Sequence, residues 1–99
     1  MVDDFSFAPP PFKPDEALQT LKRDLRALGL TEREGLFERR GRLIARAALN
    51  GAVIKAARVK RPVRSSPAWL DKVLRSSADM RDFVVDLKKQ LAQWSDSDD

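Results

Sequence analysis

The fold depends on the middle of the chain, residues 31–61, which read TEREGLFERRGRLIARAALNGAVIKAARVKR. The first four residues have the pattern of a capping box, in which a Thr and a Glu cap each other's backbone amides at the start of a helix. We expect helix from residue 32 to residue 60, either continuous or interrupted at Asn50-Gly51, with Pro62 ending it. On a helical wheel this segment is apolar on two sides, which predicts a central helix packed between others.

Three further helices are expected around it. The first runs from Pro14 to Leu28, with leucines three and four residues apart on one face and Gly29 as its C-terminal cap. A short helix follows Ser66-Pro67 and continues to Arg75, burying Trp69. The last begins at Ser76 or Ser77 and has the most regular apolar face, formed by Met80, Phe83, Val84, Leu87, Leu91 and Trp94.

The predicted fold class is therefore all-α: a compact bundle of four helices, or five if the central one is broken. The chain has 99 residues, which is enough for one domain with a modest core. We divide it into an extended Pro/Phe-rich N-terminal arm (1–13), a single helical domain (14–94) and a short acidic, disordered C-terminal tail (95–99). The arm carries Phe5, Phe7 and Phe12, which either bind a partner or pack against the domain.

Composition removes most catalytic chemistry. The sequence has no Cys, His or Tyr, so it offers no disulfide, no thiolate nucleophile, no Cys/His zinc site and no imidazole acid or base. No paired acid/base set or phosphate-binding glycine loop is present, and we expect a protein without catalytic residues, metal or cofactor. An acidic N-terminus and the lack of a long apolar run predict a cytoplasmic protein without a membrane span.

Positive charge is concentrated in the middle of the chain. The net charge of +4 divides into −2 for residues 1–34, +8 for residues 35–64 and −2 for residues 65–99. On the predicted central helix, Arg39, Arg42 and Arg46 share one face, and further basic residues follow after Asn50. Because guanidinium groups match phosphate and its counterions are released on binding, this pattern predicts nucleic-acid binding. The expected phosphate-binding residues are Arg39, Arg42, Arg46, Lys55, Arg58, Lys60, Arg61 and Arg64.

Other interpretations stay open at this point. The two acidic flanks could pair with the basic residues inside the fold, which would leave little charge for a ligand. The basic face could also bind an acidic protein, which would make the chain a helical interaction module such as an adaptor, small chaperone or antitoxin-like partner. Attachment to anionic lipid is a third reading. Partners are thus nucleic acid, DNA or RNA, or an acidic protein, and the last helix could serve a homodimer.

Overall fold

The computed structural model describes residues 12–63 and 65–97. It consists of a helix, a run of five strands and a second helix. In chain order the elements are α1 (Pro14–Ala27), β1 (Thr31–Arg33), β2 (Leu36–Arg39), β3 (Arg42–Asn50), β4 (Val53–Val59), β5 (Trp69–Leu74) and α2 (Ser77–Ser97).

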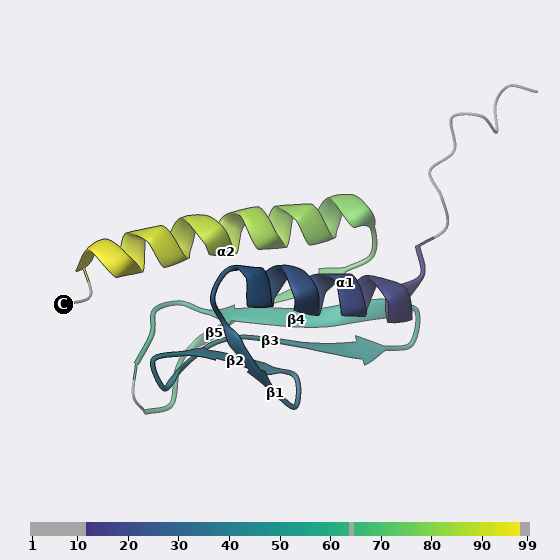
Figure 1. Ribbon diagram of the computed structural model, residues 1–99. Coiled ribbons are helices and arrows are strands. Elements are labelled where there is room, and N and C mark those ends of the chain that lie inside the picture. The colour runs from purple at the N-terminus through teal and green to yellow at the C-terminus, as the bar shows by residue number, and fades with distance from the viewer. Residues whose placement is uncertain (1–11, 64, 98–99) are drawn as a thin grey trace, which may run out of the picture.

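The architecture is two-layered, so the expected all-α bundle of four or five helices is wrong. The five strands form one antiparallel sheet in sequence order, β1-β2-β3-β4-β5, and each pairs only with its neighbours in the chain. Both helices lie on the same face of this sheet (Figure 1). The other face carries neither of them, and we call it the open face.

The central helix predicted over residues 32–60 is replaced by β1 to β4. Three two-residue turns that each contain a glycine explain the difference, because each closes a hairpin. Glu34-Gly35 and Arg40-Gly41 both have positive φ at both residues, at 53° and 83° and at 57° and 77°. This is the backbone of the two-residue turn whose twist matches that of antiparallel strands. The third turn is Gly51-Ala52, between the paired residues Asn50 and Val53, and only its glycine has positive φ, 63°. The predicted helix break at Asn50-Gly51 is thus the start of a hairpin turn.

A β-bulge hides the alternation of β3. Phe37 of β2 pairs with Ala45, whereas the next residue, Glu38, pairs with Leu43, so Ile44 is an extra residue on β3. As a result Ile44 and Ala45, although consecutive, are both buried in the core under the helices. A strand with two adjacent buried side chains does not show the simple period of two that identifies a half-buried strand in a sequence.

The predicted short helix over residues 66–75 is also wrong, since Trp69–Leu74 is the edge strand β5. It pairs with β4 over six residues, from Val59↔Trp69 to Ile54↔Leu74. The backbone of Lys60 also donates a hydrogen bond to the carbonyl of Ala68, which extends the pairing into the loop. Pairing with a long neighbouring strand outweighs the helix-start signal of Ser66-Pro67.

Both terminal helices of the prediction are confirmed. In α1, Leu18, Leu21 and Leu25 are buried on the face toward the sheet. In α2 the expected apolar face packs on the same core, with Leu87 completely buried and Trp94 partly buried. The Ser76 hydroxyl accepts a hydrogen bond from the amide of Asp79, which caps the start of α2 as predicted.

Some expected features fall outside the described residues. These are Phe5 and Phe7 of the arm, and Arg64. Phe12, the third phenylalanine, is partly buried and packs against the core. The division into arm, domain and tail stays a prediction.

Candidate nucleic-acid interface

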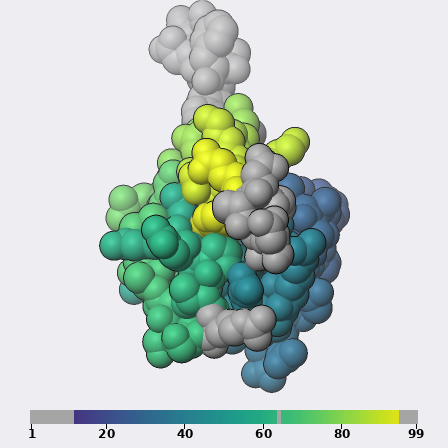
Figure 2. Space-filling model, turned by 90° about the vertical axis from the view of Figure 1, so that its left-hand side faces the viewer, coloured from purple at the N-terminus to yellow at the C-terminus, as the bar shows by residue number. Residues whose placement is uncertain are grey.

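Two basic segments lie at one end of the sheet. One is the turn between β2 and β3, where Arg39 and Arg42 pair across Arg40-Gly41. The other is the start of the loop after β4, with Lys60 and Arg61. Because β3 and β4 are antiparallel, the first residues of β3 and the last of β4 meet at the same end, which Figure 2 views directly. We call this group the basic end: Arg39, Arg40, Arg42, Lys60 and Arg61.

The remaining arginines expected to bind phosphate point to opposite faces. Arg58 faces the helices: its Nε donates to Oδ2 of Asp86 on α2 at 2.6 Å, and its side chain is only 15% exposed. Arg46 lies on the open face, where its Nη2 is 3.3 Å from Oδ1 of Asp71 on β5. Arg39 and Arg42 are direct cross-strand partners and share a side of the sheet, but the bulge at Ile44 places Arg46 on the other side, so the predicted single face of these three arginines is wrong.

These two ion pairs bear on whether the acidic flanks neutralise the basic segment within the fold or leave its charge for a ligand. Asp71 and Asp86 both belong to the acidic C-terminal flank, and each pairs with one arginine of the basic segment. Internal neutralisation is thus real for Arg46 and Arg58. In the described part of the chain, Lys55, Lys60 and Arg61 make no ion pair. Among the described residues of the basic segment, the positive charge that no ion pair or other interaction uses is thus that of Lys60 and Arg61 at the basic end and of Lys55 on the open face.

Arg46 also stacks on an aromatic ring. Its Cζ lies 4.5 Å from the ring centroid of Trp69, a cation–π contact. Arg46, Ala57 and Asp71 are direct cross-strand partners on β3, β4 and β5. To reach Asp71, the arginine therefore crosses above Ala57, and this explains why that alanine has no exposed area on a face without helices.

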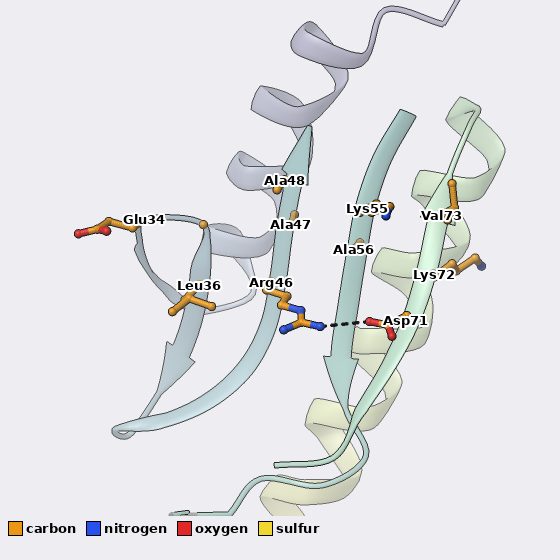
Figure 3. A pocket seen from close by; sticks show the side chains of 11 residues that line it. Glu34, Leu36, Arg46, Ala47, Ala48, Lys55, Ala56, Asp71, Lys72 and Val73 are labelled. Atoms are coloured by element: carbon orange, nitrogen blue, oxygen red, sulfur yellow. Dashed lines mark hydrogen bonds and ion pairs between the residues drawn. The ribbon is translucent and has the colours of Figure 1, made fainter. Parts of the chain in front are cut away.

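Beside this stack the open face is hollowed. A depression of about 620 Å³ lies between β2 and β5, and Figure 3 shows Arg46 reaching across it toward Asp71. Its size is typical of small-molecule sites, which occupy roughly 300–1,000 Å³. Apolar and charged side chains share its lining, among them Leu36, Ala48, Val73, Arg46, Lys55 and Lys72.

Lys55 lies on the same face as Arg46, two residues along β4 from Ala57, the partner of Arg46. At about 3.4 Å per residue this is roughly 7 Å from the Arg46 row. Sequence reasoning named Lys55 but missed Trp69 and Asp71 as members of this surface. Their signal, a basic strand paired with a strand carrying Trp and Asp on the same face, appears only once the register between β4 and β5 is known.

On the face of the sheet that the helices cover, Glu32 links α1 to β1. Its carboxylate is 3.2 Å from Nζ of Lys22 and 3.1 Å from Nη1 of Arg26. The hydrogen bond from Lys22, opposed by partial desolvation and helped by the neighbouring charges, holds the pKa of Glu32 below its ordinary value of 4.5. Two further basic residues of the chain are thus used to fasten a helix to the sheet.

Comparison of the chain with family models, with curated proteins and with solved structures returned no match. Neither helix of the described part is long and apolar enough to cross a membrane. Among the same residues, no group of three or more acidic side chains is arranged to hold a metal ion. The expectation of a protein without catalytic activity stays a prediction.

Proposed function

We propose that this protein binds nucleic acid through the basic end of its sheet. The observation that carries the proposal is the convergence of the β2–β3 turn and the loop after β4 at one end of the molecule. The 32 residues between Glu38 and Asp71 contain no acidic residue, so no carboxylate from this stretch competes with a phosphate there. Lys60 is exposed, and so is Arg61.

The physical basis is counterion release. Each phosphate contacted by Lys or Arg frees condensed cations, and the observed affinity therefore falls with salt, with a logarithmic slope of about −0.9 per contact on duplex DNA and about −0.7 on single strands. At the basic end, Lys60 and Arg61 are two such side chains that are exposed and make no ion pair with the described residues. Sequence specificity is not part of the proposal, because contacts to phosphates carry no base information.

The test is fluorescence anisotropy with labelled single-stranded and duplex oligonucleotides over a salt titration. The double variant Lys60→Glu/Arg61→Glu is expected to lose about tenfold or more in affinity at low salt. The matched control is Lys88→Glu/Lys89→Glu, which makes the same charge change on exposed residues of α2. The proposal is wrong if the unmodified protein binds neither probe at low salt, or if both double variants lose affinity equally.

A second candidate function is binding of an acidic protein. It is favoured by β5, an edge strand of six residues on which Leu70 is 40% and Val73 37% exposed. An extended partner segment could add a strand to this edge, with its acidic residues toward the basic end. Competition separates the two candidates: polyglutamate displacing a bound oligonucleotide at equal charge concentration would favour the protein partner. Cytoplasmic residence is proposed with either function.

A further inference from the structure

The open face contains apolar surface that has no role in binding a phosphate. The hollow beside Arg46 is only partly charged, and its apolar part comes from Leu36, Ala48 and Val73. A phosphate gains nothing from such surface, whereas a ligand with both a flat apolar group and a negative charge would use all of it. Within residues 12–63 and 65–97, neither helix packs over this face.

Arg46 forms a planar wall of the hollow, and its guanidinium is stacked on Trp69, which itself does not line the hollow. A guanidinium group held over an indole ring presents a flat, cationic surface, and bases of single-stranded nucleic acids stack on such planes and on aromatic rings. Asp71 lies 3.3 Å from Arg46 on the side of the guanidinium toward β5. The small side chain of Ala48 leaves room next to this wall for a flat ring.

Cations lie on both sides of that position. Lys55 is two residues along β4 from Ala57, the cross-strand partner of Arg46, and shares the open face, whereas Lys60 is three residues away in the other direction, just past the end of β4, where strand alternation directs its side chain to the other side of the sheet. At about 3.4 Å per residue, these two residues span roughly 17 Å along the strand. This arrangement fits a nucleic-acid strand whose phosphates are held before and after one inserted base.

We infer that the hollow receives an unstacked base of a single-stranded nucleic acid, next to Arg46 and above Ala48, while the basic end and Lys55 hold the flanking phosphates. The inference rests on the proposed function and narrows its ligand from nucleic acid in general to single strands. Bases inside a duplex are paired and stacked, so their flat faces cannot enter a hollow of this kind. Duplex DNA would meet only the basic end.

The experiment compares two labelled strands of equal length, about ten nucleotides: a mixed-sequence oligonucleotide and an abasic strand with the same number of phosphates. The unmodified protein is expected to bind the base-containing strand about tenfold more tightly, because stacking on a protein surface adds to phosphate binding. Ala48→Ile fills the hollow with a residue that favours strands and adds no charge. It is expected to remove the difference without changing affinity for the abasic strand.

Arg46→Lys is an independent variant. It keeps the positive charge but removes the planar guanidinium, and it too is expected to bring the two affinities together. Ala92→Ile, at an exposed position of α2, adds the same atoms elsewhere and is expected to leave the ratio unchanged. Circular dichroism checks that each variant is folded.

The outcomes separate the two proposals. If neither strand binds, the proposed function fails and this inference fails with it. If both strands bind the unmodified protein equally, nucleic-acid binding stands while the base site is wrong. If both Ala48→Ile and Arg46→Lys still bind the base-containing strand more tightly than the abasic strand, by the same factor as the unmodified protein, the base site is also wrong, because the preference then arises elsewhere.

Discussion

Arg58 of β4 and Asp86 of α2 join the two layers of the fold through a hydrogen-bonded ion pair of 2.6 Å. The arginine is largely buried and also donates to the carbonyl of Val59 at 3.0 Å, so removing its carboxylate partner leaves a charge without an anion. We expect Asp86→Ala to lower the free energy of unfolding by about 1–2 kcal/mol. Urea denaturation measures this.

Asp82→Ala is the matched control for that change. Asp82 lies on the same helix, is exposed and makes no ion pair among the described residues. The propensity gained on replacing Asp by Ala in a helix is common to both variants. Equal midpoints for Asp86→Ala and Asp82→Ala would show that the interlayer pair contributes nothing measurable.

Glu32 makes stability depend on pH. Its pKa is lower in the folded chain than its ordinary value of 4.5, chiefly through the hydrogen bond from Lys22. The ionised carboxylate therefore stabilises the fold above that value, and this contribution is lost as the pH falls through the folded pKa. We expect Glu32→Gln to be less stable than the unmodified protein at pH 7, and the gap between them to narrow at an acidic pH well below 4.5, as the carboxylate is protonated.

Thermal unfolding at the two pH values checks this, with Glu16→Gln as the control. Glu16 is exposed, and its ion pair with Lys13 is long, 3.9 Å, so this pair contributes little to stability. A gap for Glu32→Gln that is the same at both pH values would contradict the assignment.

The two glycines that close the first two hairpins differ in their surroundings. Gly35 and Gly41 have similar positive φ, 83° and 77°, but a Cβ on Gly35 would lie 3.1 Å from the carbonyl oxygen of Ala47, whereas one on Gly41 would meet nothing within 4 Å. We expect Gly41→Ala to cost about 1 kcal/mol from backbone strain alone. Gly35→Ala should cost roughly 1 kcal/mol more, because β2 must also move away from β3.

Urea midpoints of the two glycine variants give the comparison directly. If Gly41→Ala is as destabilising as Gly35→Ala, the contact with Ala47 has no energetic effect.

Asp71 limits the positive charge of the open face. It pairs with Arg46 at 3.3 Å, but its side chain is 75% exposed, so the pair contributes little to stability. We expect Asp71→Asn to leave unfolding nearly unchanged and to raise affinity for oligonucleotides by about two- to fivefold at low salt. Anisotropy measures the gain.

Asp82→Asn, on the helical layer, changes the net charge by the same amount. It should raise affinity less than Asp71→Asn does, because its charge lies on the opposite layer from the open face. Identical gains would mean that net charge alone, and not the open face, determines binding.

Sequence reasoning succeeded where a pattern is local and complete. The leucines of α1 repeat at helical spacing after Pro14, and Ser76 caps α2 before an uninterrupted apolar face. In each helix the spacing of apolar residues identifies the buried face, and that face is the same whether the helix packs on a sheet or on other helices. The same holds for charge: the basic block between Glu38 and Asp71 is visible without any structure.

The sheet could not be predicted in the same way. Ala45, Ala47 and Ala48 sit in β3 although alanine favours helix, and the bulge at Ile44 disturbs the alternation that would have indicated a strand. The glycine-containing turns were the available signal, since three of them occur within residues 34–52. Assigning helix there also placed the arginines wrongly, because strand and helix send the same residues to different faces.

The order of the strands affects when the open face forms during folding. β1 to β4 are joined by turns of two residues, so their pairings close short loops, whereas β5 must return across residues 60–68 before it reaches β4. Loop closure costs more entropy as the loop lengthens, and we expect β5 to dock last and to open first. Since Trp69 and Asp71 belong to β5, the contacts that Arg46 makes with them beside the hollow are absent until that strand arrives. Amide hydrogen exchange along β5 would then report directly on how often the ligand surface is assembled.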